Sequence, residues 1–377
     1  MKIDKKFVKK TSKEKLMERY KPKQEFVERI EKLIGKEDSE KFFEISYFST
    51  PDSIRVNTLK ISPEDLKKRL EDYGWKIRQP FTEFPEVLIV ERESNLKPGE
   101  LGKTFEHLLG YYYVQEISSM LPMLALKPQA GELFLDLCAS PGSKTTQAAA
   151  MMDNQGTIIA NEVNLGRIRI LNSNLEKCGV MNVMVTRKDG VQFCHRWEEE
   201  IKMKFDKILV DAPCSGEGTL RKSPRTFDMW NVNFIRSLSR IQRKMAGEAL
   251  KLLKVGGEMI YSTCTLAPEE DEMVVNYLKQ NFDIEIMKVD LPLKLRDGVT
   301  EWEGEKLDEQ IKNCRRLYPQ DNNTDGFFLA KIKKLSDKCL LEKDDKFKKF
   351  EQKYMNKSNR IEDEFESEDK MEAQNEN

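Results

Sequence analysis

Short apolar runs alternate with longer amphipathic stretches from about residue 111 onward. The runs have the length of buried strands, and they predict strands at residues 133–137, 157–161, 182–186, 207–211 and 258–262. A stretch with helical spacing follows each run. Strands that alternate with helices in this way predict an α/β fold with a doubly wound, mostly parallel sheet.

Two later segments and one long helix extend this pattern. Residues 282–289 and 326–332 have strand character and could add an antiparallel edge to the sheet. The spacing in residues 235–253 predicts an amphipathic helix. We expect its apolar face in the core (Ile235, Leu238, Ile241, Met245, Ala249, Leu252) and its basic face largely in water (Arg236, Arg240, Arg243, Lys244).

The chain before residue 111 has a different pattern. Within residues 25–110, strand-like segments at 53–57 and 87–90 flank a helical segment at 63–73, which predicts a small α+β module. We therefore divide the chain into an N-terminal α+β region (1–110), a larger α/β domain (111–334) and a charged tail (335–377). Residues 361–377 hold eight acids against one lysine, and this composition predicts disorder.

Charge and composition restrict the classes of function. The net charge of the 377 residues is -1, yet residues 1–24 hold ten Lys/Arg against three acids, which suits either a solvated helix face or contact with RNA. Seven cysteines without framework spacing indicate reduced thiols and a cytoplasmic protein. The chain has only two histidines, which are few for a zinc site or for a catalytic triad that depends on histidine. No apolar run approaches the ~20 residues of a membrane span. We expect no metal and no membrane, and a monomer.

The loop after the first predicted strand has the features of a cofactor site. Asp136 ends the strand, and residues 138–145 form a tight turn into a helix. The phosphate-binding P-loop does not fit, because Cys138 stands where its first glycine belongs and Ser143 precedes Lys144. The Gly-x-Gly-x-x-Gly dinucleotide motif is absent. S-adenosylmethionine is then the common cofactor that remains.

Acidic residues follow the next strands at suitable places. Glu162 comes at the end of the second strand, where a carboxylate could bind ribose hydroxyls. Asp189 comes after the third strand, where a polar group could lie near the adenine amine. A single acid at a strand end is usually a solvent-exposed residue. Acids at successive strand ends are a stronger indication of a binding site.

Two cysteines follow two other strands. Cys214 comes after the strand at 207–211 and Cys264 after the strand at 258–262, with the long helix between them. A right-handed crossover makes these strands parallel, so both thiols emerge at one sheet edge, where such folds bind ligands. We expect the other free cysteines to be small buried hydrophobic residues (Cys178, Cys194, Cys314, Cys339), and Cys138 to pack in the cofactor loop.

A thiol pair at such an edge suits cytosine chemistry. Carbon 5 of cytosine is a poor nucleophile, and addition of a thiolate at carbon 6 makes it able to attack a sulfonium methyl group. This addition needs a proton or a strong hydrogen bond at N3, which a buried carboxyl with a raised pKa can supply. Asp211, three residues before Cys214, is the candidate. A second thiol could assist when the carbon 5 proton is removed.

These segments together resemble the NOL/NOP/Sun family of RNA cytosine-5 methyltransferases. The similarity covers about residues 53 to 333 and is carried by residues 113–122, 138–145, 211–218, 261–265, 268–270 and 325–330. Residues 55–57 are similar to the family's lead-in segment. The resemblance implies a Rossmann-like methyltransferase sheet that uses S-adenosylmethionine, behind a small N-terminal α+β domain.

The resemblance also implies roles that position leaves open. It makes Cys264 the nucleophile that attacks carbon 6 and Cys214 the thiol that helps to release the product. DNA cytosine-5 enzymes attack with the Pro-Cys thiol, so this order depends on the resemblance. Asp211 and Lys144 would also face the base. The implied cofactor contacts are Cys138, Ala139, Ser140, Pro141, Gly142, Ser143, Lys144, Glu162, Asp189 and Asp211, although the family often has aspartate where Glu162 stands.

RNA would be the partner. The modest size of the chain, with no room for an inserted RNA-binding domain between residues 90 and 111, suits a tRNA enzyme slightly better than a ribosomal one by analogy. Three cations just past the Cys214 loop, Arg221, Lys222 and Arg225, are candidates for phosphate contact. Two alternatives stay open at this point. One is an amino-methyltransferase, although the chain has Asp211-Ala212-Pro213-Cys214 where such enzymes have Asn/Asp-Pro-Pro-aromatic. The other is a non-catalytic RNA-binding or ribosome-assembly factor.

Overall fold

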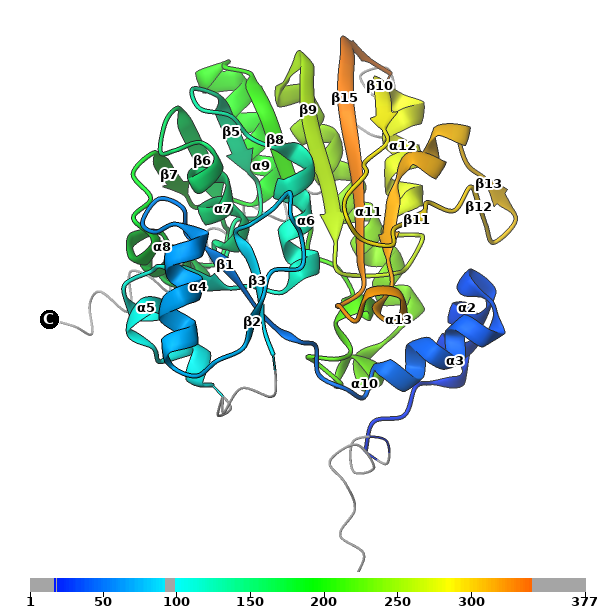
Figure 1. Ribbon diagram of the computed structural model, residues 1–377. Coiled ribbons are helices and arrows are strands. Elements are labelled where there is room, and N and C mark those ends of the chain that lie inside the picture. Colours follow the sequence, from blue (N-terminus) through cyan, green and yellow to red (C-terminus); the bar gives the residue numbers. More distant parts are fainter. Residues whose placement is uncertain (1–16, 18, 92–98, 341–377) are drawn as a thin grey trace, which may run out of the picture.

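Five parallel strands form the centre of the computed structural model, which describes residues 17, 19–91 and 99–340 (Figure 1). They lie in the order β7-β6-β5-β8-β9. Each corresponds to a predicted strand: β5 (Leu133–Asp136), β6 (Thr157–Asn161), β7 (Val183–Thr186), β8 (Phe205–Asp211) and β9 (Leu253–Thr263). The doubly wound α/β prediction is confirmed. The acidic segment 361–377 and most of the basic segment 1–24 lie outside the described residues.

An antiparallel edge follows β9. The long strand β15 (Phe327–Cys339) pairs with β9, and β10 (Phe282–Met287) pairs with β15. Both predicted late strands are therefore present. β15 continues through residue 339, so the chain is still a strand where the charged tail is predicted to begin. β14 (Arg315–Leu317) and β11 (Arg296–Asp297) complete the sheet, and sequence could not predict them because two or three residues show no period.

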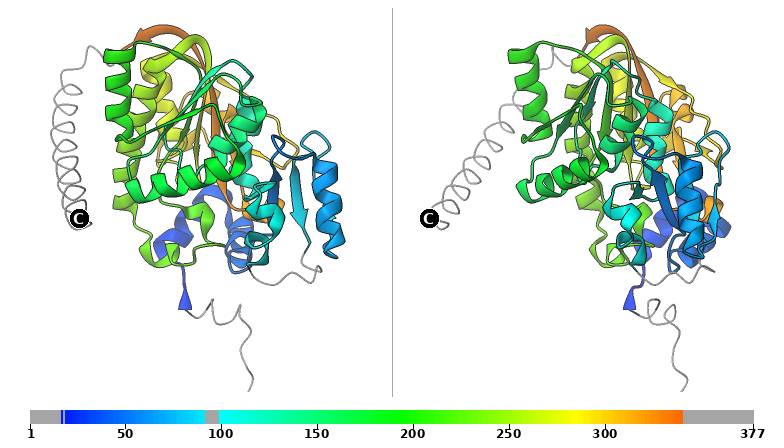
Figure 2. Two further views of the ribbon diagram at one scale, coloured as in Figure 1. Left: turned by 90° about the vertical axis from the view of Figure 1, so that its left-hand side faces the viewer. Right: turned by 60° about the vertical axis from the view of Figure 1, so that its left-hand side comes forward.

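Helices cover both faces of this sheet (Figure 2). On one face, α9 (Gly190–Arg196), α11 (Val232–Leu252) and α12 (Glu272–Asn281) bury their apolar side chains against the strands. On the other face, α6 (Ile117–Leu126) and α7 (Ser143–Met151) do so, with α8 (Leu165–Cys178) beside α7. In the described part of the chain, no helix has the length and apolarity that would let it cross a bilayer.

The long helix α11 begins where Asn231 accepts hydrogen bonds from the backbone N–H groups of residues 233 and 234. Four residues of its predicted apolar face are buried, and Leu238 and Ile241 are half-buried. Lys244, which we predicted on the wet face, is also buried. The reason is that α9 and α12 both pack against α11, so that more than one face of the helix is covered.

A second, small sheet has the order β2-β3-β1-β4, with β1 (Asp52–Val56), β2 (Ile77–Arg78), β3 (Val87–Val90) and β4 (Tyr112–Val114). Helix α4 (Pro63–Asp72), capped by the Ser62 side chain, covers one side of it. On the other side, Val87 and Ile89 pack with α6. Because β4 lies past residue 110, the small sheet extends beyond the predicted domain boundary.

Helices α2 (Gln24–Ile34) and α3 (Lys36–Ile45) do not join the small sheet. They pack against α10 (Thr226–Met229) and the start of α11 through an aromatic cluster that includes Phe26, Phe42, Phe227 and Trp230. Figure 1 shows them beside α10, below the long strands. The remaining short elements are η1 (Glu100–Gly102), α5 (Phe105–Leu108), η2 (Trp197–Ile201), η3 (Glu217–Thr219), β12 (Glu301–Trp302), β13 (Glu305–Lys306), η4 (Glu309–Asn313) and α13 (Pro319–Asn322).

One buried arginine joins the small sheet to the large domain. Arg55, on β1, donates to Gln115 Oε1 (2.5 Å), to the Ser143 carbonyl (2.5 Å) and to Thr146 Oγ1 (2.8 Å). Burial lowers the pKa of Arg55 to about 10. Because Ser143 and Thr146 lie in the first turn of α7, this contact ties the N-terminal region to the helix that follows the cofactor loop.

Candidate active site

The predicted site residues meet at the carboxyl edge of the parallel strands. From β5 the chain continues to β6 and β7 on one side, whereas β8 and β9 lie on the other side. The strand order therefore reverses between β5 and β8, and open α/β sheets bind ligands at such a point. The cofactor loop follows β5, and the two cysteine loops follow β8 and β9.

The loop between β5 and α7 is held by its neighbours. The Ala139 N–H donates to the Asn161 carbonyl at the end of β6. Arg167 of α8 donates to the Ser140 carbonyl (2.7 Å), and Ser140 Oγ donates to the Arg167 carbonyl (3.0 Å). Gly142 has φ 99° directly before α7, in the left-handed region that favours glycine. The loop thus has a defined shape that leads into the N-terminus of α7.

Three carboxyl groups line this edge beside the loop. Asp136 accepts from Thr145 Oγ1 through one oxygen (2.7 Å), while its Oδ1 is buried without a hydrogen-bond partner among the described residues. Burial raises the pKa of Asp136 to about 7. Glu162 Oε2 lies 3.3 Å from Arg167 Nη1, which makes an ion pair. Asp189 caps α9, because its Oδ1 accepts a hydrogen bond from the Val191 N–H (3.0 Å).

These residues fit the cofactor that the loop predicts. Carboxylates suit the hydroxyl and amino groups of S-adenosylmethionine, and the unpartnered oxygen of Asp136 is an acceptor that the protein leaves unused. Bound there, S-adenosylmethionine would supply an electrophilic methyl group. Among the described residues, no cluster of three or more His, Cys, Asp or Glu side chains could hold a metal ion.

Lys144 and Asp211 form an ion pair beside the cysteine loops. Lys144 Nζ lies 2.6 Å from Asp211 Oδ2 and 3.1 Å from Ser119 Oγ, and the lysine is only 8% exposed. Ser262 Oγ donates to Asp211 Oδ1 (2.7 Å), which joins the ends of β8 and β9. We predicted that Asp211 is the proton donor, but in this structure both carboxylate oxygens accept. In this pair Lys144 Nζ is the buried hydrogen-bond donor.

The two predicted cysteines are neighbours. Cys214 Sγ and Cys264 Sγ lie 3.2 Å apart, and both residues are half-buried. Their loops are joined by the Gly218 N–H, which donates to the Cys264 carbonyl (2.9 Å), and by a hydrogen bond between Ser215 Oγ and Thr265 Oγ1 (2.7 Å). The hydrogen bond to Cys264, together with burial, raises the pKa of Cys214 well above its usual range. This shift favours the neutral thiol form of Cys214.

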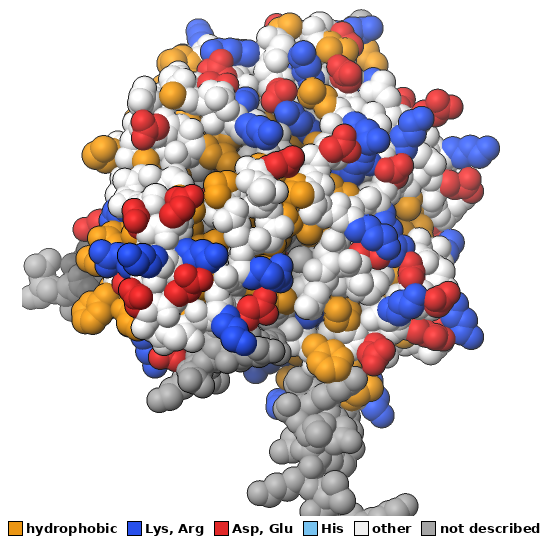
Figure 3. Space-filling model, viewed as in Figure 1, with side chains coloured by type: hydrophobic (Ala, Val, Ile, Leu, Met, Phe, Trp, Pro, Cys, Tyr) orange, Lys and Arg blue, Asp and Glu red, His pale blue; other side chains and the backbone are white. Residues whose placement is uncertain are grey.

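The three predicted RNA-contacting cations differ in exposure. Arg221 is only 7% exposed, and its guanidinium donates to the carbonyls of Phe48, Ser49 and Thr324 and to Asn323 Oδ1. We predicted that Arg221 contacts phosphate, but in this structure its donors join three segments of the protein. Lys222 and Arg225 are exposed, and Lys222 also pairs with Asp325 (2.8 Å). Acidic and basic side chains are interspersed over the face in Figure 3.

Several polar residues of the site were not predicted. Asp136, Ser119 and Ser262 each bond within it, and Gln242 and Glu270 lie behind the Cys214 loop. The acid at the end of the first strand was noted without a role, and Ser119 and Glu270 lie in segments that carry the resemblance. Gln242 lies in the middle of α11, and no local pattern distinguishes it.

Comparison with known proteins decides the family. A model described as 16S rRNA methyltransferase RsmB/F matches residues 123–333, and a model of the N-terminal domain of 16S rRNA methyltransferase RsmF matches residues 23–117. The chain belongs to the RsmB/F methyltransferase family. This confirms the resemblance to the Sun family. This RsmB/F protein is an S-adenosylmethionine-dependent RNA cytosine-C5 methyltransferase. Neither the amino-methyltransferase nor the non-catalytic alternative has support.

Relatives of this RsmB/F protein include enzymes for two kinds of RNA. The tRNA (cytosine(49)-C(5))-methyltransferase of Pyrococcus abyssi is 41% identical over 308 residues, which are 82% of this chain and 95% of the relative. The ribosomal RNA small subunit methyltransferase F of Vibrio cholerae is 40% identical over 286 residues, 75% of this chain. The match spans only 58% of that relative's length.

Solved structures agree with the fold. A methyltransferase homolog protein from Pyrococcus horikoshii has a TM-score of 0.74 at 36% identity, over 86% of this chain and all of the other. NSun6 from the same organism, solved with SFG, has a TM-score of 0.70 at 24% identity, over 83% of this chain and 98% of the other. The second likeness shows the shared fold alone.

Proposed function

We propose that this enzyme forms 5-methylcytosine in tRNA, with Cys264 as the nucleophile, Cys214 as the thiol that assists release, and Lys144 as the proton donor. One observation carries the mechanism. Two thiols lie 3.2 Å apart at the same sheet edge as the ion pair of Lys144 with Asp211. The preference for tRNA is supported by the match to nearly the whole P. abyssi tRNA enzyme, whereas only part of the ribosomal RNA enzyme from V. cholerae is matched.

The first steps form the covalent adduct. The Cys264 thiolate forms an S–C6 bond while cytosine N3 takes a proton from the Lys144 ammonium. Asp211 holds this ammonium in place and balances its charge. Carbon 5 becomes enamine-like and can attack the sulfonium methyl group that bound S-adenosylmethionine would supply, with the thioether as the leaving group.

The last steps release the product. The carbon 5 proton passes to water, the C5–C6 double bond re-forms, and the electrons of the S–C6 bond return to Cys264. N3 gives its proton back to Lys144. Cys214 donates its S–H hydrogen bond to the departing sulfur, which suits a thiol that stays protonated beside Cys264.

Trapping with RNA that contains 5-fluorocytosine tests this order, because carbon 5 then carries no proton to lose. We expect a covalent adduct for the wild type, none for Cys264→Ala, and an adduct that accumulates on ordinary RNA for Cys214→Ala. A gel shift under denaturing conditions measures the amount of covalent protein–RNA adduct. The opposite pattern of the two variants would reverse the roles.

The RNA class needs its own measurement. Nucleoside mass spectrometry of tRNA and of small-subunit ribosomal RNA, each purified from a strain without this gene, should show loss of 5-methylcytosine in tRNA only. Loss confined to ribosomal RNA contradicts the tRNA proposal and leaves the mechanism standing. Bisulfite sequencing of the affected RNA then identifies the cytosine.

A further inference from the structure

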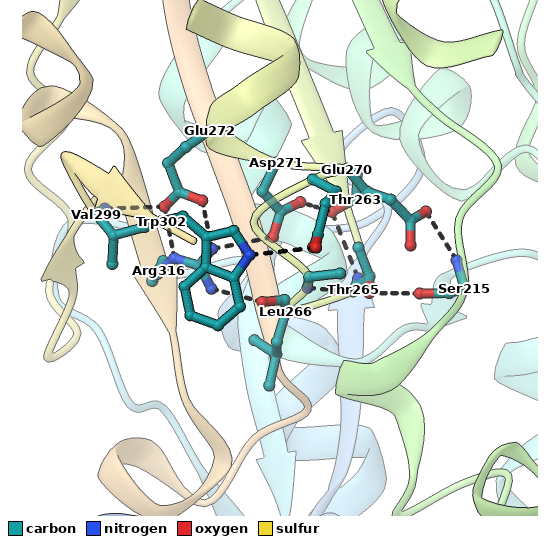
Figure 4. A network of polar contacts seen from close by, with 12 residues as sticks. Ser215, Thr263, Thr265, Leu266, Glu270, Asp271, Glu272, Val299, Trp302 and Arg316 are labelled. Carbon is teal, nitrogen blue, oxygen red and sulfur yellow. Dashed lines mark hydrogen bonds and ion pairs between the residues drawn. The ribbon is translucent and has the colours of Figure 1, made fainter. Parts of the chain in front are cut away.

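A buried carboxyl lies behind the loop that carries Cys214. Glu270 is fully buried in the turn between β9 and α12, six residues after Cys264. Its Oε2 accepts a hydrogen bond from the Ser215 backbone N–H at 3.0 Å, as Figure 4 shows. Since Ser215 follows Cys214 directly, this bond fixes the peptide group on the carboxyl side of the thiol.

A glutamine from another element fixes the opposite side. Gln242, in the middle of α11, places Nε2 2.9 Å from the Pro213 carbonyl and 2.8 Å from Glu270 Oε2. Pro213 directly precedes Cys214. The peptide groups before and after Cys214 are therefore both held by one side-chain pair, and neither member of the pair has a role in the mechanism described above.

The turn that carries Glu270 is held by several buried hydrogen bonds. Tyr261 OH donates to the Glu270 carbonyl (2.5 Å), and Thr263 Oγ1 donates to Asp271 Oδ1 (2.6 Å). The buried Arg316 pairs with Glu272 and donates to the Leu266 carbonyl (3.0 Å). Figure 4 shows the contacts of Thr263 with Asp271 and of Arg316 with Glu272 and Leu266. Cys264 lies in the same segment as Glu270. The bond from Glu270 to Ser215 therefore links the loop of Cys264 to the loop of Cys214.

Packing alone does not account for this carboxyl. Burial raises the pKa of Glu270 to about 7, with a contribution from the Glu217 carboxylate, and its Oε1 is buried without a hydrogen-bond partner among the described residues. A buried acid that is incompletely bonded destabilises a fold compared with an apolar residue of similar shape. Such groups concentrate at functional sites.

We propose that Glu270, with Gln242, is a positioning residue that aims the S–H of Cys214 at the Cys264 sulfur and so sets the rate at which the RNA adduct is released. This inference rests on the proposed role of Cys214. An S–H group is a weak donor, and a shift of its loop by a fraction of an ångström would misdirect it. Formation of the adduct does not depend on Cys214 and should be spared.

The test compares adduct formation and adduct release for Glu270→Ala, Glu270→Gln and Gln242→Ala on ordinary and 5-fluorocytosine RNA. We expect Glu270→Ala and Gln242→Ala to slow release by about tenfold, the scale of one lost hydrogen bond to a charged group, and to change formation by less than about twofold. Glu270→Gln keeps an acceptor for the Ser215 N–H and should release the adduct within about threefold of the wild type.

Glu269→Gln is the matched control. Glu269 is the neighbouring carboxylate, but its side chain pairs with Arg29 and accepts a hydrogen bond from Trp302, whereas the Glu270 side chain bonds to the Ser215 N–H. Wild-type release in Glu270→Ala and Gln242→Ala overturns the proposal, as does equally slow release in Glu270→Gln and Glu270→Ala. If Glu270→Ala does not fold, Glu270→Gln and Gln242→Ala decide. An adduct in Cys264→Ala overturns the proposed mechanism instead, so the two failures are distinguishable.

Discussion

Lys144 and Asp211 depend on each other at the residue scale. A lysine with 8% of its surface exposed needs a partner, and Asp211, 67 residues away in the chain, provides it at 2.6 Å. The environment also distinguishes the cations near the Cys214 loop, which differ in exposure and in hydrogen bonding. Arg221 is held by four acceptors and Arg225 is exposed, although they are only four positions apart. Residue type alone does not distinguish them.

Replacing the lysine tests its role as proton donor. Lys144→Met keeps a long side chain without the ammonium, and we expect methylation to fall by about 10²–10⁴-fold because general acid catalysis has that scale. Ser119→Ala removes only a hydrogen bond to Lys144 and should reduce the rate by less than about tenfold. Single-turnover methylation measures both rates, and circular dichroism checks folding. Wild-type rates in Lys144→Met would contradict the mechanism.

Asp136 predicts a pH dependence of stability. Burial raises its pKa from 3.8 to about 7, so the folded state keeps a proton that the unfolded state has lost. The stability that Asp136 contributes is complete below pH 3.8 and is lost as the pH rises toward about 7. Asp136→Asn should be more stable than the wild type at pH 8, with on the order of 4 kcal/mol as the upper limit.

Urea unfolding of the wild type and Asp136→Asn at pH 5 and at pH 8 checks this expectation. The difference in unfolding free energy between the two proteins is compared at each pH, because the contributions of the other titrating groups are the same in both and cancel. A difference that does not change with pH would show that Asp136 ionises normally in the folded protein.

At the scale of elements, the two cysteine loops depend on a close backbone approach. Gly218 follows Cys214 by four residues, and Gly326 precedes β15. A Cβ atom on Gly218 would lie 2.2 Å from the Gly326 carbonyl oxygen and 2.8 Å from the Cys264 carbonyl oxygen. The loops after β8 and β9 and the start of β15 can therefore meet only where position 218 has no side chain.

Gly218→Ala should separate these loops. We expect a loss of adduct formation of at least about tenfold, because misplacement of reacting groups by about 1 Å has large effects on rate. Binding of S-adenosylmethionine, measured by calorimetry, should change little. Gly102→Ala is the control, since no atom lies within 4 Å of the added Cβ there. Equal activity of both variants would contradict the expectation.

Elements with a strong local pattern were predicted well. The five parallel strands, β10, β15 and α11 are present because their apolar periods are long enough to specify a face. The strands β4, β11 and β14 were missed, since two or three residues have no period and their pairing depends on partners elsewhere in the chain. The burial of Lys244 was missed for a related reason, because it depends on the packing of α9 and α12.

At the scale of the whole molecule, the N-terminal region is joined to the carboxyl edge of the large sheet. Arg55 links β1 to α7, and α2 and α3 pack on α10 and α11 beyond the Cys214 loop. An RNA whose cytosine reaches the cysteines must first unstack that base. The exposed cations Lys222 and Arg225 follow the Cys214 loop directly in the chain, which makes them the candidates for contact with RNA phosphates.

The double variant Lys222→Ala/Arg225→Ala tests this contact. We expect weaker binding of RNA and a salt dependence whose slope is smaller by about two, one for each lost phosphate contact. Binding of S-adenosylmethionine should be unchanged. Arg221→Ala should instead lower the melting temperature, because it removes hydrogen bonds within the protein. Unchanged RNA binding in the double variant would exclude these two side chains from the interface.

The sequence by itself determined the alternation of strands and helices along the chain, because this depends on local periodicity. It also predicted the cofactor loop and the two cysteines of the site from short motifs. Only the tertiary structure decided which groups touch. It brought Cys214 and Cys264, 50 residues apart, to 3.2 Å, and it changed Asp211 from a predicted donor to an acceptor for Lys144. It also placed Glu270 and Gln242 behind the Cys214 loop. Hydrogen bonds and burial depend on neighbours from distant parts of the chain, and no local pattern specifies those neighbours.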